Sequence, residues 1–283
     1  MSATTFLDAM GRTVAVARPP RRLVSLVPSW TEALFAFGLA DVVVGVTKFC
    51  VEPRHGVAAK AKVGGTKTLD VKRVVELRPD LVVANAEENR REDLEALMAE
   101  GLTVYVTFPM TVAGAIEAMR DIAEMTDATE TAGPLIRACE EALAGALAAN
   151  ERRPPLRVFC PIWRNPPRPA QGSVWMTIGP DTYMHDFIAA CGGLNVFGDS
   201  EERYPQADLE EMARREPEVI LLPDEPYRFG PKHLPELQAF PEVPAVREGR
   251  TYLLEGKQLC WYGPRIANSL RFVQDLLSGK ETA

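Results

Sequence analysis

The chain repeats one pattern, first as Asp70-Val-Lys-Arg-Val-Val-Glu-Leu-Arg-Pro79-Asp-Leu-Val-Val-Ala84 and, 138 positions later, as Asp208-Leu-Glu-Glu-Met-Ala-Arg-Arg-Glu-Pro217-Glu-Val-Ile-Leu-Leu222. Each copy opens with an aspartate, a residue type that caps helix N-termini. Each then reaches a proline, which cannot continue a helix, and runs into a short apolar stretch. A strand that is apolar on both faces is typical of a parallel sheet covered by helices. The sequence therefore predicts the same helix–strand unit in each half.

This duplication predicts an α/β fold of two Rossmann-like lobes with parallel sheets and a ligand cleft between the lobes. Between them, the Ala-, Leu- and Glu-rich residues 129–150 predict a helix about 30 Å long that joins the lobes. The expected boundaries are an N-terminal hairpin at 1–21, a first lobe at 22–127, a connecting backbone helix at 128–153 and a second lobe at 154–283.

Composition narrows the function classes. A formal net charge of −7 argues against nucleic-acid binding, and no apolar run is long enough to insert into a membrane. Five widely spaced cysteines, with no C-x-x-C, favour reduced thiols and no zinc site. The N-terminus has neither a basic nor an apolar leader region, which favours the cytoplasm for the chain as given, or a periplasmic location if a leader has been removed.

Catalytic signatures are missing from the sequence. It contains no G-x-S-x-G, no H-E-x-x-H and no dinucleotide-binding fingerprint, so we do not expect an enzyme. The three histidines stand in different segments, and a surface or helix-end position is the simplest explanation for each. Among them His55 is the candidate for an axial metal ligand.

Aromatic residues recur where predicted strands give way to loops. In α/β sheets the loops at the carboxyl ends of strands line the ligand crevice, and large planar side chains there suit a large planar ligand. Packing in the core explains any single one of these aromatics equally well. The candidate ligand-binding residues are Trp30, Lys48, Phe49, Thr66, Trp163, Trp175, Tyr183, Tyr204, Trp261, Tyr262 and Arg265.

Several motifs together resemble a known family. They are Arg22-Leu-Val-Ser-Leu-Val-Pro-Ser-Trp-Thr-Glu32, Leu77-Arg-Pro-Asp-Leu-Val82, Cys191-Gly-Gly-Leu-Asn-Val-Phe197, Tyr204-Pro-Gln206 and Trp261-Tyr262. The chain resembles the helical-backbone (class III) substrate-binding proteins of ABC importers, closest to the vitamin B12-binding branch. That resemblance implies that aromatics of both lobes sandwich a corrin, a role that falls by position to Phe49, Trp175, Tyr204 and Trp261.

The resemblance also implies a partner, the membrane permease of an importer, which such proteins contact through a glutamate on each lobe. The corresponding candidates here are Glu92, which follows Arg91, and Glu225. The tracts Thr47-Lys-Phe-Cys-Val-Glu-Pro53 and Gly64-Gly-Thr-Lys67 resemble a leaderless group, for which a cytoplasmic protein that retains the cleft is the alternative.

The resulting hypothesis is a solute-binding protein for a metal chelate, cobalamin or another corrinoid, with no intrinsic cofactor. An iron–siderophore or haem is the rival ligand, and the cations that would meet an anionic siderophore are Lys48, Lys67, Arg164, Arg203, Arg228 and Arg265. The rival outside the binding class is an enzyme that acts on such a chelate, with Glu87, Glu225 or Asp181 as acid or base.

Overall fold

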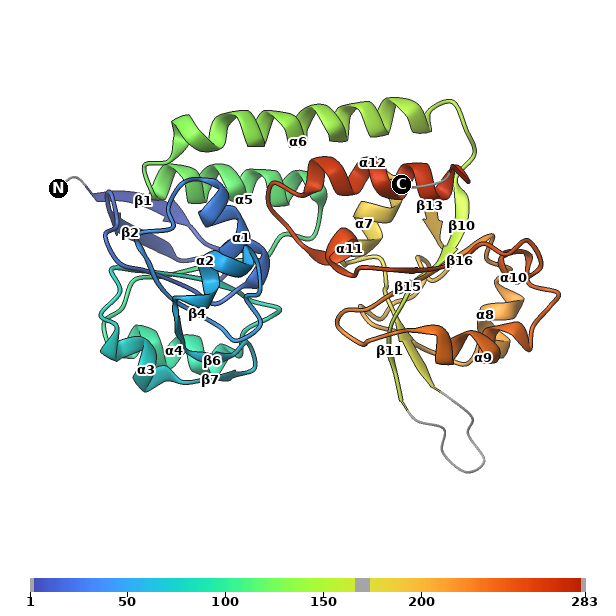
Figure 1. The fold of residues 1–283 in the computed structure, drawn as a ribbon, viewed down its shortest axis with the longest axis horizontal. Coiled ribbons are helices and arrows are strands. Elements are labelled where there is room, and N and C mark those ends of the chain that lie inside the picture. The colour runs from blue at the N-terminus through green and yellow to red at the C-terminus, as the bar shows by residue number, and fades with distance from the viewer. Residues whose placement is uncertain (1–2, 166–173, 281–283) are drawn as a thin grey trace. The chain divides into compact units, whose positions relative to one another are not determined.

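The computed structural model describes residues 3–165 and 174–280, and these form two compact units (Figure 1). The first unit comprises Met1–Pro109, Gly114–Ala138 and Tyr262–Pro264. The second comprises Met110–Ala113, Cys139–Trp261 and Arg265–Ala283. The chain therefore returns briefly to the first unit near its C-terminal end.

The first unit is built on a five-stranded, all-parallel sheet. Its strand order is β5 (Ala61–Lys62), β4 (Val43–Val46), β3 (Leu23–Ser25), β8 (Leu81–Asn85) and β9 (Val104–Thr107). The helices are α1 (Pro28–Ala36), α2 (Arg54–Ala58), α3 (Val71–Glu76), α4 (Arg91–Ala99) and α5 (Val112–Met125). Two antiparallel hairpins complete it, β1 (Ala3–Leu7) with β2 (Thr13–Ala17) and β6 (Gly64–Gly65) with β7 (Thr68–Leu69).

The second unit contains a four-stranded parallel sheet. Its order is β13 (Gly193–Asn195), β10 (Leu156–Phe159), β15 (Val219–Pro223) and β16 (Thr251–Leu254). A smaller antiparallel sheet joins β11 (Pro161–Arg164), β12 (Trp175–Thr177) and β14 (Gln206–Ala207). The helices are α7 (Tyr183–Ala190), α8 (Leu209–Arg214), η1 (Pro231–His233), α9 (Leu234–Gln238), α10 (Pro244–Arg247), α11 (Lys257–Cys260) and α12 (Ile266–Leu277).

The repeated phrase forms the same structure in both units, as the sequence predicts. The side chain of Asp70 accepts a hydrogen bond from the backbone N–H of Arg73 at 2.9 Å, and that of Asp208 accepts one from Glu211 at 2.7 Å. After each helix the residue before the proline adopts a left-handed conformation, with φ of 46° at Arg78 and 44° at Glu216. The apolar stretches that follow are the fully buried strands β8 and β15.

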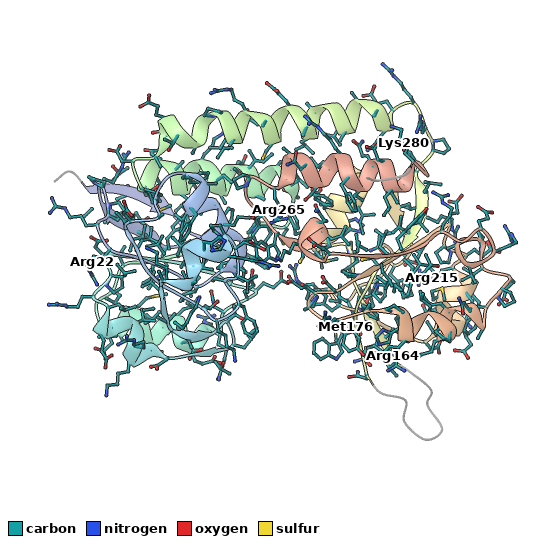
Figure 2. The ribbon with its side chains drawn as sticks, in the orientation of Figure 1. Arg22, Arg164, Met176, Arg215, Arg265 and Lys280 are labelled. Atoms are coloured by element: carbon teal, nitrogen blue, oxygen red, sulfur yellow. The ribbon has the colours of Figure 1, made fainter. Side chains whose placement is uncertain are left out.

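The likeness extends to hydrogen bonds that no sequence motif specifies. The guanidinium of Arg22, labelled in Figure 2, donates to the carbonyl of Leu77 at 2.9 and 2.7 Å. The guanidinium of Arg157 donates in the same way to the carbonyl of Arg215, from its Nε at 3.1 Å. Arg22 immediately precedes β3 and Arg157 is the second residue of β10. The same clamp therefore ties an inner strand of the parallel sheet to the end of the repeated helix in both units.

A single long helix, α6 (Thr129–Asn150), connects the units in sequence (yellow-green in Figure 1). Its 22 residues correspond to a length of about 33 Å at 1.5 Å per residue. Residues up to Ala138 belong to the first unit and those from Cys139 to the second.

Removing either aspartate cap is expected to destabilise the fold by a similar amount. We predict that Asp70→Ala and Asp208→Ala each lower the free energy of unfolding by about 1 kcal/mol, the usual value of an N-cap hydrogen bond. Denaturant unfolding followed by circular dichroism measures this. The control Lys72→Ala, at an exposed position of α3, should stay within about 0.5 kcal/mol. A large effect at one aspartate and none at the other would mean that the two helices are not equivalent.

Candidate functional site

Strand order locates the candidate site in each unit. In the first unit the chain proceeds outward from β3 to β4 and β5 on one side and to β8 and β9 on the other, so the order reverses between β3 and β8. In the second unit it reverses in the same way between β10 and β15. Open parallel sheets bind ligands outside the carboxyl ends of their strands at such a reversal. The loops that follow these strands are therefore the candidate ligand-binding segments.

A buried polar network holds this edge of the first sheet together. The amide of Asn89 accepts from the backbone N–H of Asn85 at 2.9 Å and donates to the carbonyls of Leu26 at 3.3 Å and Thr66 at 3.4 Å. One side chain thus links the ends of β3 and β8 to the β6–β7 turn. Because three segments depend on it, this network fixes the positions of the loops that surround the edge.

Trp30 belongs to the same buried network and does not face a ligand. Its indole N–H donates to the Thr107 hydroxyl at 2.9 Å, and that hydroxyl donates in turn to the carbonyl of Ala84 at 3.0 Å. The indole is fully buried and packs against the ring of Tyr262, with ring centroids 5.3 Å apart. The predicted ligand contact is corrected for Trp30: its position after the first strand places it under the edge, in the core.

Lys48, Phe49 and Thr66 come together on an exposed part of the first unit. Phe49 follows β4 and keeps 51% of its surface exposed, and the ammonium of Lys48 lies 5.2 Å from the centre of its ring. The backbone N–H of Lys48 donates to the carbonyl of Gly64 at 2.8 Å, which attaches this loop to the β6–β7 hairpin. Thr66 and Lys67 form the turn of that hairpin. We call Lys48, Phe49, Val51, Thr66 and Lys67 the first-unit face.

The chemistry of the first-unit face combines apolar area with positive charge. Phe49 and Val51 are both exposed apolar side chains, and an exposed aromatic ring suits contact with a flat apolar ligand. Lys48 and Lys67 carry ammonium groups, and the ammonium of Lys67 donates to the carbonyl of Glu87 at 2.6 Å. The face can therefore stack on an apolar ring and hydrogen-bond to oxygens at the edge of that ring.

Trp175 lies in the core of the second unit, contrary to the prediction that it contacts ligand. Its ring is fully buried and stacks on Phe229 with centroids 5.2 Å apart and planes 20° apart. Phe159 packs beside it at 6.4 Å. The turn next to Trp175 suggested a loop position, but the residue opens strand β12 and its side chain points into the hydrophobic cluster.

Trp163 is the exposed tryptophan of the same unit. It keeps 43% of its surface exposed and meets the ring of Tyr227 edge-on, with centroids 5.6 Å apart. The Tyr227 hydroxyl lies 3.2 Å from Nε2 of the buried His233, and burial lowers the pKa of His233 below 6.5. Beside them Arg164 pairs with Glu236 at 2.7 Å, so this arginine is already committed to a carboxylate.

Trp261 is held inside the second unit rather than overhanging its surface. Only 6% of the residue is exposed, and its indole N–H donates to the carboxylate of Glu225 at 3.0 Å. The Lys257 ammonium and the Arg265 guanidinium each lie 5.2 Å from its ring (Arg265 is labelled in Figure 2). Glu225 is therefore engaged within its own unit, and its role in docking stays a prediction. Burial raises the pKa of Glu225, although the Trp261 bond acts in the opposite direction.

The remaining tyrosines are distributed over different environments. Tyr183 opens α7 and is buried against Phe187, with centroids 5.9 Å apart. Tyr204 is half-buried, and the guanidinium of Arg203 lies 5.6 Å from its ring. Tyr262 was expected beside Trp261 in the second lobe, but it belongs to the first unit and is buried there on Trp30.

Two further predicted residues are exposed. Glu92 lies in the first turn of α4, where its carboxylate is 3.5 Å from Nε of Arg90. Its side chain is accessible to a partner because 72% of its surface is exposed. His55 is exposed in the short helix α2. Across residues 3–165 and 174–280, no group of three or more metal-binding side chains is present.

Some residues of the site were not predicted from the sequence. Asn85, Asn89 and Thr107 look like ordinary loop or strand-end residues, and their roles arise only from contacts with distant segments. The Gly64–Gly65 pair is typical of a loop, so the sequence indicates a turn there. It does not indicate which side chains pack against Gly65.

The fold is of the α/β class, and sequence comparison identifies a family of substrate-binding proteins. The periplasmic binding protein family matches residues 23–257, and the chain belongs to it. This family membership agrees with the expectation of a binding protein rather than an enzyme. None of the helices within the described residues is sufficiently long and apolar to cross a membrane.

Two relatives indicate which branch of the family this chain resembles. The chain is 28% identical over 221 residues to a vitamin B12-binding protein of Vibrio cholerae, which covers 77% of this chain and 76% of the relative. It is 25% identical over 257 residues to a vitamin B12-binding protein of Vibrio parahaemolyticus, with 89% and 87% coverage. The sequence resemblance to the B12-binding branch is confirmed by these relatives, in which the vitamin is a ligand.

Solved structures share the fold. The periplasmic vitamin B12-binding protein BtuF of Vibrio cholerae matches with a TM-score of 0.76 at 24% identity, over 92% of this chain and 97% of that chain. The periplasmic heme-binding protein RhuT from Roseiflexus sp. RS-1 matches with a TM-score of 0.79 at 23% identity, over 92% and 98%. The heme-binding protein BhuT, in complex with two hemes, matches with a TM-score of 0.76 at 25% identity, over 90% and 98%.

Proposed function

We propose that this protein binds cobalamin or another corrinoid as its ligand. The observation that carries the proposal is the first-unit face, where an exposed aromatic ring lies beside an ammonium group on loops that follow parallel strands. Such a surface suits a flat ring with carbonyl groups along its edge, and a corrin has both. The vitamin B12-binding relatives support this choice of ligand.

Haem is the second candidate ligand. Heme-binding proteins, RhuT and BhuT among them, share the fold, and Lys48 and Lys67 would meet the carboxylates of a haem as well as the amides of a corrin. Titration calorimetry with cyanocobalamin, haemin and a ferric hydroxamate separates the candidates. We expect one cyanocobalamin per chain; binding of haemin or of the hydroxamate, with no heat from cyanocobalamin, would contradict the corrinoid proposal.

Phe49 is the residue whose removal should weaken binding without harming the fold. We predict that Phe49→Ala weakens cyanocobalamin binding about thirtyfold, since an aromatic anchor is worth about 2 kcal/mol. The melting temperature of the ligand-free protein should change little because half of the ring is exposed. The matched control is Leu7→Ala in β1, an exposed apolar residue outside the first-unit face, which should bind normally. Equal effects of the two substitutions would rule out a specific role for Phe49.

We further propose that the protein delivers its ligand to an ABC importer permease. The exposed carboxylate of Glu92 in α4 is the docking candidate that the structure leaves accessible. Such delivery needs an extracytoplasmic location, whereas a cytoplasmic protein would retain the ligand without a permease. Fractionation of the source cells decides between these: recovery with the cytoplasmic proteins would exclude a permease partner.

A further inference from the structure

Gly65, the buried second residue of β6, lies directly beneath the first-unit face. A Cβ atom at this position would be 3.1 Å from Cε2 of Phe49 and 3.2 Å from Cε of Lys48. It would also be 2.8 Å from the hydroxyl of Thr68. The two side chains that form the centre of the face therefore rest on a residue that has no side chain.

The neighbouring glycine serves a different purpose. Gly64 has a φ of +92°, and a Cβ there would lie 2.4 Å from the backbone oxygen of Thr68. Gly64 is thus required by the backbone of the hairpin. Gly65 lies outside the left-handed region, so its backbone accepts alanine, and only side chains oppose the additional methyl group.

The loop that carries Phe49 cannot simply move away from such a methyl group. Its backbone is attached to the hairpin by the 2.8 Å hydrogen bond from Lys48 to Gly64. The hairpin turn is attached to the sheet edge by the 3.4 Å bond from Asn89 to the carbonyl of Thr66. Because both backbones are fixed, side chains must give way. They are the hydroxyl of Thr68 and, by a few tenths of an ångström, the ring of Phe49 and the stem of Lys48.

We infer that Gly65 is a positioning residue, which sets where the Phe49 ring and the Lys48 ammonium are presented to the ligand. This inference rests on the proposed function of the first-unit face and adds a residue to it. Stacking and hydrogen bonding to one planar ligand both depend on where these two groups lie relative to each other. A methyl group at position 65 changes that arrangement without removing either group.

A double-mutant cycle tests the inference with cyanocobalamin as the probe. Thr68→Ala first removes the 2.8 Å contact, so that a second substitution, Gly65→Ala, acts through Phe49 and Lys48. In this background Gly65→Ala should weaken binding about tenfold, part of the effect expected for the loss of the ring itself. When Phe49 and Lys48 are also replaced by alanine, Gly65→Ala should cause no further loss. An equal loss in both backgrounds would overturn the positioning role.

A ligand-free measurement keeps this inference separate from the proposed function. In protein labelled with fluorophenylalanine, the ¹⁹F resonance of residue 49 is assigned through Phe49→Leu. Gly65→Ala in the Thr68→Ala background should shift that resonance. The equivalent change at the exposed Gly145 of α6, which has no atom within 4 Å of its Cβ position and no left-handed φ, should not. An unshifted resonance overturns the inference. If wild-type protein binds none of the probes, the proposed function fails, and the ¹⁹F result alone decides whether Gly65 positions the ring.

Discussion

Replacing Trp175 by alanine is expected to lower the free energy of unfolding by about 3–5 kcal/mol, the usual cost of removing a large aromatic from a core. The residue is fully buried, stacks on Phe229 and packs beside Phe159, so the substitution leaves a cavity that these rings cannot fill. Denaturant unfolding followed by circular dichroism measures the loss. Such a change is a large fraction of the stability of an ordinary domain.

Trp163→Ala is the matched control for this substitution. It removes a tryptophan from β11, the strand that pairs with the strand carrying Trp175, but from a position that is 43% exposed. We expect a loss of about 1 kcal/mol or less, since one edge contact with Tyr227 and part of the ring's burial are given up. A stable Trp175→Ala variant that fails to bind cyanocobalamin would reverse our assignment and restore Trp175 to the ligand site.

The fold was predictable because its signals are local. Asp70 and Asp208 cap helices, and Pro79 and Pro217 end them, through interactions within a few residues of the chain. The apolar stretches that follow have no polar face, which indicates burial on both sides whatever the partner strands are. Duplication of these signals then predicted two α/β units, each with a parallel sheet.

The site was predictable only where position along a strand was sufficient. Lys48, Phe49 and Thr66 follow strands or stand in turns. The structure places Lys48 beside Phe49 and attaches their loop to the hairpin that carries Thr66, while their role in binding stays a prediction. Trp30 and Trp175 have the same local context, but distant residues bury them, Tyr262 in one case and Phe229 in the other. Whether an aromatic beside a turn faces outward depends on residues far away in the sequence. The local pattern of apolar residues does not identify those packing partners.

The roles of the polar residues around the site were even harder to predict, because they depend on contacts with distant segments. Asn89 joins three segments, and two of its acceptors, Leu26 and Thr66, lie 63 and 23 positions away in the sequence. An asparagine near the end of a strand is common, so its residue type alone does not distinguish this one. Gly65 is likewise an ordinary turn glycine until the position of the Phe49 ring is known.

Trp261→Ala is expected to lower the free energy of unfolding by about 3 kcal/mol, because it deletes a buried ring and the hydrogen bond to Glu225. The sequence predicted a ligand contact for Trp261 instead, and the loss of an exposed ligand contact would leave the melting temperature nearly unchanged. Thermal unfolding of the ligand-free protein decides between these. If Trp261→Ala melts normally and binds cyanocobalamin poorly, the ligand-site assignment stands and the packing role is wrong.

The substitution Trp261→Phe isolates the hydrogen bond, and its cost should depend on pH. Burial already raises the pKa of Glu225 above 4.5, whereas the hydrogen bond from the Trp261 N–H lowers it. Because the variant removes this N–H, the pKa of Glu225 should rise further. A carboxyl group whose pKa is raised by folding contributes to stability at pH values below its pKa in the unfolded chain. This contribution is lost as the pH rises through its pKa in the folded protein. The cost of Trp261→Phe should therefore be larger at pH 7 than at pH 4.5.

The control for this pH dependence is the same change in a Glu225→Gln background. Glutamine cannot ionise in this range, so the cost of Trp261→Phe should then be equal at the two pH values, while the neighbouring Lys257 and Arg265 remain in place. Equal costs in the wild-type background as well would show that the Trp261–Glu225 bond does not favour the ionised carboxylate. If the loss of unfolding free energy caused by Trp261→Phe grows with pH only when Glu225 is present, the Trp261–Glu225 bond stabilises the second unit. Stacking on the ligand is then a role for aromatic residues that remain exposed, such as Phe49.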